Sequence, residues 1–514
     1  MVFSLRPVRL VAILVGSFTL LRAAAGAQTV LEGVDLVVVE RIRAEGYHRS
    51  QIDQLAGYLM DVIGPRLTGS TAMRRANEWS ADQFRRWGLA NVVVEPWGRF
   101  GRGWERVSFS GRILEPFIWP LQGTALAWSG STPGPVSGPA VYVRIADTAD
   151  FGRYRGLLRG ALVLRDTAVV SPPEFARDSL RTPLARLRDT TPEPTPPAAG
   201  PEQRARSRAQ DELERRIDDL FRAEQVTAIL TPSSRPYTIL RPRGGPLGTL
   251  ARDSAGFEPL PAVMLSQEQY NLIFRNLRRG IPVRLELDVR NRWLTDDPMA
   301  YNTLAEIPGT DLRDQVVMIG AHLDSWFGGT GATDNGAGSV VVMEAMRILK
   351  TLGLAPRRTI RVALWSAEEG GLRGSRGWVR RHREELDRIS AYLNIDTGTG
   401  RIRAIWDQHN GAAGRIFRQI LAPFEPDGVV GIRRGYDGGT DHLSFDEAGV
   451  PGFDFDQDLI EYWTRSHHTA ADTYERLLMD DLRQAAVVMA ATAYHLAMRD
   501  GMMPRKPAPA GTGN

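Results

Sequence analysis

Polar side chains follow three apolar β runs of the sequence, at the points where strands are expected to end. The first run ends in His322-Leu323-Asp324, the second in Glu368-Glu369 and the third in Asp396. In doubly wound sheets ligands bind beyond the carboxyl ends of the strands, so these residues are the first candidates for chemistry. A single acidic residue at a strand end is usually a cap or a solvated turn, but three such ends together indicate a site.

Two further polar clusters complete the candidate set. Asp334-Asn335 opens an expected helix, where Asp is also a preferred N-cap, and His467-His468 precedes the last expected helix. The chain has 8 histidines, and two of them stand at this one place. Imidazole and carboxylate groups without a thiolate suit one or two zinc ions. The candidate ligands are His322, Asp334, Glu369, Asp396 and His468.

These motifs resemble, in the same order, the successive motifs of the M28 family of zinc metallopeptidases. The matching segments are His322-Leu323-Asp324, Asp334 to Gly338, Glu368-Glu369, Asp396-Thr397-Gly398 and His468-Thr469. Outside the site, the stretches 64–70 and 449–452 resemble the carboxypeptidase Q branch of that family. The resemblance implies a zinc exopeptidase fold with an inserted domain similar to a protease-associated domain.

The resemblance also implies a role for each residue. Asp334 would bridge two Zn²⁺ ions, with His322 and Asp396 completing one metal site and Glu369 and His468 the other. The implied catalytic residues are Glu368 as general base, Asp324 as the acceptor that orients His322, and His467 near the oxyanion. Neighbouring carboxylates on an extended segment point opposite ways, so Glu369 can bind metal while Glu368 faces the water.

Substrate contacts are expected from Asp441 and His442. Their loop resembles the Ser-Asp-His loop of M28 aminopeptidases, although the carboxypeptidase Q branch usually keeps only the aspartate, and a hydrogen-bonded turn is the alternative. The carboxylate-rich site favours a substrate with a free amine. Arg434 or Arg465 could instead hold the carboxylate of a dipeptide.

Alternating strands and helices must position these residues. From Thr303 onward we expect strands at 315–320, 359–365 and 389–395, and helices at 335–352 and 480–498. That order predicts an α/β fold with a mostly parallel mixed sheet flanked by helices. Before it, two helices within 50–87 flank the turn Gly64 to Ser70, and 91–95 reads as a strand.

Differences in sequence pattern and composition divide the chain into several expected parts. We expect residues 28–134 and 295–502 to form the catalytic zinc peptidase domain, and residues 135–294, with short apolar β runs, to form the β-rich insert. Within the insert, 171–216 is rich in proline and charge and is expected to be a mobile excursion without a core. Residues 503–514 are expected to be a disordered tail.

Composition restricts the class of protein. Of the 514 residues 43% are hydrophobic and 24% charged, which excludes general disorder and a membrane-spanning bundle. The net charge of +4 comes from scattered arginines, so no nucleic-acid partner is expected. The chain has no cysteine, which excludes disulfides and a lipoprotein anchor.

The first residues predict export. Arg6 and Arg9 precede the apolar run 10–21, and Ala25-Gly26-Ala27 matches the cleavage pattern of signal peptides. We therefore expect a signal peptide at 1–27 that is cleaved near Ala27, and a secreted or periplasmic protein without stable membrane insertion.

The leading hypothesis is a secreted di-zinc exopeptidase that hydrolyses dipeptides or short peptides with a free terminus. A zinc glutaminyl cyclase on the same fold is one alternative, and the expected single zinc of such enzymes separates the two. A non-enzymatic receptor is another, and the presence of all five ligands and Glu368 argues against it. The expected partner is a peptide, with a homodimer left open.

Overall fold

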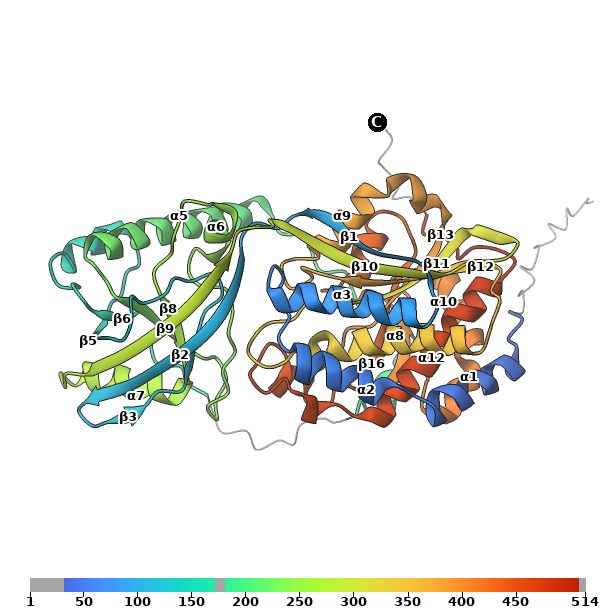
Figure 1. Cartoon of the computed structure of the whole chain (residues 1–514), viewed down its shortest axis with the longest axis horizontal. Coiled ribbons are helices and arrows are strands. Elements are labelled where there is room, and N and C mark those ends of the chain that lie inside the picture. Colours follow the sequence, from blue (N-terminus) through green and yellow to red (C-terminus); the bar gives the residue numbers. More distant parts are fainter. Residues whose placement is uncertain (1–31, 172–180, 508–514) are drawn as a thin grey trace, which may run out of the picture.

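The computed structural model describes residues 32–171 and 181–507, which form two units that lie side by side (Figure 1). Over these residues each unit is built on one 8-stranded sheet. In the first unit the order is β1 (Ala90–Arg99), β10 (Met299–Ile307), β12 (Arg358–Trp365), β11 (Leu312–His322), β13 (Ile389–Asn394), β16 (Gly452–Gln457), β14 (Ile402–Trp406) and β15 (Gly431–Arg433).

Four adjacent strands at the centre of this sheet, β12, β11, β13 and β16, run parallel to one another. His322 of β11 pairs with Trp365 of β12, and Gly320 of β11 pairs with Asn394 of β13. The carboxyl ends of β11, β12 and β13 therefore lie at the same edge of the sheet. Antiparallel pairs occur toward both sides of this centre, at β1–β10, β10–β12 and β14–β16. The predicted α/β fold with a mixed sheet is confirmed.

Helices cover both faces of the first sheet. One face packs against α1 (Leu36–His48), α2 (Ile52–Gly57), α3 (Thr71–Arg86), α8 (Ala337–Thr351), α10 (Gly411–Leu421) and α12 (Met479–Met498). The other face packs against α9 (Arg373–Arg381) and α11 (His442–Asp446) through a cluster that includes Trp365, Trp378 and Phe445. Helix α8 is apolar nearly all round and is buried accordingly, as expected for a helix in the interior of a large domain.

The second unit is also a sheet between helices. Its order is β3 (Trp119–Pro120), β2 (Gly103–Glu115), β9 (Arg284–Leu294), β5 (Val136–Tyr142), β6 (Leu162–Leu164), β7 (Ala228–Pro232), β8 (Ala262–Leu265) and β4 (Gly123–Ala125). Because side chains alternate along a strand, Leu230 packs in the cluster of α7 (Gln267–Arg278), while Ile229 packs in the cluster of α5 (Pro201–Ala223). The shorter helices are α4 (Leu184–Leu187) and α6 (Gly248–Asp253).

The second unit begins earlier in the chain than the expected boundary at residue 135. Strands β2, β3 and β4, within residues 103–125, belong to its sheet, and β2 pairs along nearly its whole length with β9. The chain crosses between the units from β1 to β2 and from β9 to β10 (Figure 1). Many side chains of β2 are partly exposed, so short apolar runs do not mark this strand.

The described part of the expected excursion 171–216 is mostly exposed apart from Leu187, and its last residues, 201–216, form the first turns of helix α5. Helix α5 buries Ile217, Leu220 and Phe221 against the second sheet. Their helical spacing is hidden in the sequence by the long charged side chains around them. Upstream, the 181–195 strap contacts the first unit: Thr182 N donates to Asp458 Oδ1 at 2.8 Å and Glu193 N to Arg434 O at 3.0 Å. Residues 172–180 lie outside the described residues.

The structure describes part of the expected C-terminal tail but not the first residues of the chain. Residues 1–31, with the predicted signal peptide, lie outside the described residues. At the other end the expected disordered tail is partly docked, because Met503 is buried, its N donates to Ser390 Oγ at 3.0 Å, and Arg505 Nη2 donates to Leu386 O at 2.7 Å.

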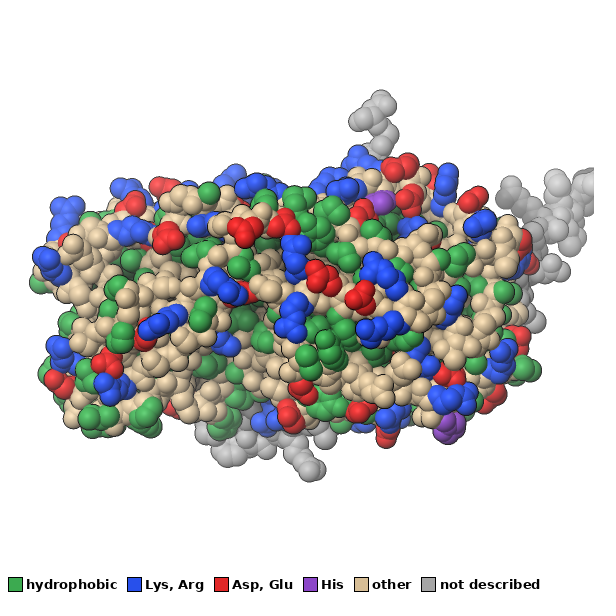
Figure 2. Space-filling model, viewed as in Figure 1, with side chains coloured by type: hydrophobic (Ala, Val, Ile, Leu, Met, Phe, Trp, Pro, Cys, Tyr) green, Lys and Arg blue, Asp and Glu red, His purple; other side chains and the backbone are tan. Residues whose placement is uncertain are grey.

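The surface agrees with the charge reasoning. On the face shown in Figure 2, Lys and Arg side chains are scattered among acidic and apolar ones and form no continuous stripe. Within the described part of the chain, no helix has both the length and the apolar character that a membrane span requires.

Candidate metal centre

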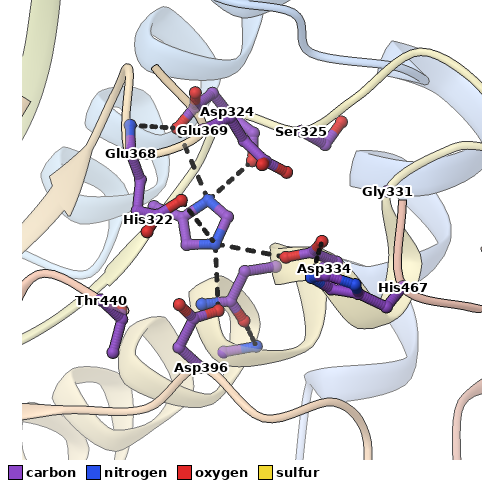
Figure 3. Close-up of polar contacts among 12 residues, drawn as sticks. His322, Asp324, Ser325, Gly331, Asp334, Glu368, Glu369, Asp396, Thr440 and His467 are labelled. Carbon is purple, nitrogen blue, oxygen red and sulfur yellow. Dashed lines mark hydrogen bonds and ion pairs between the residues drawn. The ribbon is translucent and has the colours of Figure 1, made fainter. Parts of the chain in front are cut away.

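All five predicted ligands meet at the carboxyl edge of the first sheet, four of them labelled in Figure 3 and the fifth, His468, in contact with Asp334 and Glu369. Each comes from a segment that follows a strand or precedes a helix, as the sequence pattern predicts. His322 ends β11, Glu369 lies in the turn after β12, Asp396 follows β13, Asp334 lies in the kinked turn Ala332–Gly336 before α8, and His468 follows the turn Tyr462–Ser466.

The donor atoms form two groups that share Asp334. His322 Nε2 lies 3.0 Å from Asp396 Oδ1 and 3.4 Å from Asp334 Oδ1. His468 Nε2 lies 3.1 Å from Asp334 Oδ2 and 2.9 Å from Glu369 Oε2. Each oxygen of Asp334 therefore faces a different histidine, so this one carboxylate could contribute to two metal sites.

The charges of this cluster fit bound cations. Asp334 Oδ2 and Glu369 Oε1 are buried and accept no hydrogen bond from the described residues, since the His468 contact lacks hydrogen-bond geometry. Burial opposes protonation of His468, but Asp334 and Glu369 raise its pKa to about 10. Buried carboxylates this close together demand nearby positive charge, and divalent metal ions held by these N and O donors would supply it.

A second grouping is also compact enough to hold a metal, namely Asp334, His467 and His468. His467 Nε2, however, lies 3.9 Å from Asp334 Oδ2, whereas Glu369 Oε2 lies 2.9 Å from His468 Nε2. The imidazole of His467 stacks on His468 with ring centroids 3.7 Å apart, and burial lowers its pKa to about 4. We therefore favour Glu369 as the ligand and leave His467 as a neutral side chain beside the centre.

Glu368 and Glu369 lie in a tight turn and not on the extended segment that we expected. Gly371 N donates to Glu368 O at 2.8 Å, and Ala367 has a φ of 55°. The two carboxylates still face different partners: Glu368 Oε2 lies 4.0 Å from His322 Nε2, and Glu369 contacts His468. Burial, opposed by His322 and reinforced by Asp396, raises the pKa of Glu368 well above its usual range.

Asp324 orients two groups of the centre. His322 Nδ1 donates to the backbone oxygen of Asp324 at 2.9 Å, which leaves Nε2 for a metal, while Asp324 Oδ1 is 3.5 Å from Nδ1. The carboxylate itself accepts from Thr68 Oγ1 at 2.8 Å and from Glu368 N at 3.3 Å. Asp324 therefore holds His322 mainly through its backbone and also fixes the turn that carries Glu368.

Three buried residues that support the centre were missed by sequence reasoning. Thr68 Oγ1 also accepts from Ala367 N at 2.9 Å, beside its bond to Asp324. Asp472 accepts from Thr333 N at 2.6 Å and from Asp334 N at 3.2 Å. Arg66 donates to Leu323 O and Gly331 O, both at 2.7 Å. They lie in the stretches 64–70 and 467–473, so their motifs were visible but their contacts were not.

The geometry does not favour the predicted substrate contacts of Asp441 and His442. Both side chains are fully buried. Ser375 Oγ donates to Asp441 Oδ1 at 2.5 Å, burial raises the pKa of Asp441 to about 7, and His442 Nε2 lies 3.2 Å from Asp437 O. These two residues therefore anchor the start of α11 behind the site.

The two arginines proposed for a substrate carboxylate have other partners. Arg434 Nη1 donates to Thr190 O at 3.5 Å, and Arg465 Nε lies 3.3 Å from Glu461 Oε1.

A cavity of about 940 Å³ adjoins the centre and is lined by both units. The first unit contributes Asp324, Trp326 and Glu369, and the second contributes Trp128 and Leu247. The rings of Trp128 and Trp326 meet edge to face at 6.3 Å across the junction. The site is thus a pit that the second unit partly roofs, with room for a short peptide and apolar walls beside the carboxylates.

Comparison with known proteins agrees with this geometry. The profile named "Peptidase family M28" matches residues 302–493. Carboxypeptidase Q of Mus musculus is 28% identical over 475 residues, which cover 92% of this chain and 90% of the relative. The crystal structure of a peptidase M28 precursor from Shewanella amazonensis SB2B has a TM-score of 0.66 at 26% identity, covering 92% of this chain and 99% of the other.

A more distant likeness concerns the fold alone. BSAP, a zinc aminopeptidase from Bacillus subtilis, has a TM-score of 0.55 at 18% identity, covering 90% of this chain and 95% of the other.

Proposed function

We propose that the chain, whose residues 302–493 match peptidase family M28, is a di-zinc exopeptidase acting on dipeptides or other short peptides. The observation that carries the proposal is the pair of donor groups that share Asp334. Zinc is the metal that suits ligands of this kind, and it is the metal named for the Bacillus subtilis aminopeptidase.

The five ligands would hold zinc, which would supply a lowered pKa for bound water and stabilisation of negative charge on the oxygen of the scissile carbonyl. The protein's own general base is Glu368, which contacts the centre without being one of the five ligands. Its carboxylate takes a proton from the attacking water as the new C–O bond forms. It then gives that proton to the amine nitrogen as the C–N bond breaks, and the raised pKa favours this return step.

The protein supports this chemistry by holding its groups in place. Asp324 and Thr68 fix the turn of Glu368, and Asp472 fixes the backbone of Asp334. His467 lies beside the centre as a neutral imidazole, and we propose it as a group that faces the oxyanion.

The shape of the site favours chain ends over internal bonds. The cavity is bounded by Trp326 of the first unit and by Trp128 and Leu247 of the second, so a continuous chain would have to pass between the units. A short peptide fits such a pit with one end free. Among the similar proteins are a carboxypeptidase, which acts at the C-terminus of a peptide, and an aminopeptidase, which acts at the N-terminus.

The alternatives are disfavoured by specific features. A cyclase with a single zinc has no need of a carboxylate shared by two donor groups, whereas Asp334 is arranged in that way. A receptor without catalysis would not need Glu368 beside a complete ligand set. We also infer that the chain is exported after cleavage near Ala27, which the mass of the mature protein would test.

The test of the function is hydrolysis of a free dipeptide, L-alanyl-L-leucine, by the zinc-loaded protein, compared with a longer peptide blocked at both ends. We expect the dipeptide to be cleaved and the blocked peptide to remain intact. Internal cuts in the blocked peptide would contradict the exopeptidase proposal.

A further inference from the structure

One loop of the second unit reaches the metal centre. It runs from residue 233 to 247, between β7 and α6, and we call it the arginine loop because it carries Arg235, Arg241 and Arg243. Arg235 Nη2 donates to Trp463 O at 2.5 Å, and Ala470 N donates to Leu240 O at 2.7 Å. These bonds fix the loop against the segment that carries His467 and His468.

Within this loop Arg241 points at the centre. Its Nη2 donates to His467 Nδ1 at 3.3 Å, and His467 in turn stacks on the ligand His468 at 3.7 Å. One imidazole ring therefore separates the guanidinium from the metal ligands. His467 lies outside the lining of the 940 Å³ cavity, which contacts the centre at Asp324 and Glu369. Arg241 and the cavity thus meet the centre at different residues.

The positive charge of the loop interacts electrostatically with the metal centre, because Asp334 and Glu369 favour the charged form of Arg241. Among the described residues, no carboxylate forms an ion pair with Arg235, Arg241 or Arg243, and Arg235 Nε is buried without a hydrogen-bond partner. Burial and the two neighbouring arginines lower the pKa of Arg241. Other buried arginines are paired with carboxylates, as Arg347 with Glu45 and Glu344, or donate to backbone oxygens, as Arg66 does. Three neighbouring cations, of which Arg235 and Arg241 are partly buried, attract an anionic ligand.

We propose that Arg241, with Arg235 and Arg243 behind it, binds the free terminal carboxylate of the peptide and so limits the leaving group to one amino acid. The proposal rests on the proposed exopeptidase function. One imidazole ring lies between Arg241 and the ligand His468, and in a dipeptide the scissile carbonyl and the terminal carboxylate belong to adjacent residues, whose Cα atoms lie about 3.8 Å apart. A guanidinium also binds a carboxylate through two parallel N–H donors. The residue on the amine side would then occupy the cavity.

The experiment compares L-alanyl-L-leucine with its C-terminal amide in the wild type and in Arg241→Gln, all loaded with zinc. For the free dipeptide we expect Arg241→Gln to raise KM at least about 10-fold, because a charge-assisted contact is lost, with a smaller change in kcat. For the amide the variant should resemble the wild type. Arg241→Lys should recover part of the loss, and the exposed Arg434→Gln serves as the control that keeps wild-type kinetics.

Binding is measured separately so that the two proposals can fail independently. Calorimetry with L-leucine and L-leucinamide should show tighter binding of the acid to the wild type, and this preference should vanish in Arg241→Gln. Equal binding of acid and amide, or equal effects of Arg241→Gln on both substrates, would overturn the inference and leave the exopeptidase function standing. Absence of peptide hydrolysis with an intact preference for the acid would instead overturn the exopeptidase function.

Discussion

Asp334 is the residue on which both halves of the centre depend, because each of its carboxylate oxygens faces a different histidine. Asp334→Asn should therefore reduce zinc content, while Glu368→Gln should retain zinc and lower kcat by at least about 10²-fold. Metal analysis and dipeptide turnover of the two purified variants check this pair. Near-normal turnover in Glu368→Gln would mean that another group is the base, and equal zinc loss would make Glu368 a ligand.

Thr68 tests whether the support of the Glu368 turn matters. Thr68→Val removes a hydroxyl that donates to Asp324 and accepts from Ala367 N, and it leaves both partners buried. We expect a roughly 10-fold lower kcat with unchanged zinc content and little change in KM, since the base is displaced and no ligand is lost. The matched control is Thr310→Val, the same substitution in the turn before β11, at the end of the strand away from His322. Wild-type kinetics in Thr68→Val would remove Thr68 from this role.

The ligands could be predicted from sequence and their supports could not. His322, Glu369 and Asp396 follow strands, and the chemistry of a metal site restricts which residue types can bind. Thr68 contacts Asp324 across a sequence separation of 256 residues, and Arg241 contacts His467 across 226. A local sequence pattern cannot predict contacts between residues this far apart in the chain. The prediction that Glu368-Glu369 lies on an extended segment was wrong because the chain turns sharply at Ala367. Alanine rarely adopts a positive φ, so the sequence gives no sign of this turn.

At the scale of elements, helix α5 has a highly charged composition but still contributes apolar side chains to the core of the second unit. Most charged residues of α5 are exposed, with Asp218 as a buried exception, whereas Phe221 is fully buried in the second unit. Phe221→Ala should lower the free energy of unfolding by about 3–5 kcal/mol, and Arg206→Ala on the exposed side of α5 by less than about 0.5 kcal/mol. Denaturant titration measures both. Equal small effects in the two variants would contradict the assignment of Phe221 to the core of the second unit.

Another element contact, between α9 and β1, predicts a pH dependence. His382 Nδ1 lies 2.9 Å from Glu385 Oε1 and its Nε2 2.8 Å from Glu95 Oε1, and these carboxylates raise the pKa of His382 to about 9. A raised pKa stabilises the fold fully below the unfolded value of about 6.5, and the effect is lost as pH rises toward 9. His382→Gln should thus cost about 1–2 kcal/mol at pH 6 and much less at pH 9.5.

Thermal unfolding of His382→Gln across this pH range, with the exposed His48→Gln as control, checks the sign. A loss of stability that grows with pH would contradict the assignment of a protonated His382.

At the scale of the whole molecule, the first unit followed from the sequence more closely than the second. Expected strands such as 359–365 and the closing helix at 480–498 agree with β12 and α12 within a few residues, because buried parallel strands are continuous apolar runs. The second unit was displaced at its start, since β2 is half exposed and its partner β9 is distant in sequence. That displacement matters for function, because the second unit supplies Trp128 and Arg241 to the site.

The count of zinc ions per chain tests the central claim most directly. The two donor groups that share Asp334 predict about two zinc ions per purified chain after mild dialysis, and loss of dipeptide hydrolysis in chelator with recovery when zinc is restored. A fully active protein that contains one zinc ion, or that keeps its full activity in chelator, would contradict the di-zinc account.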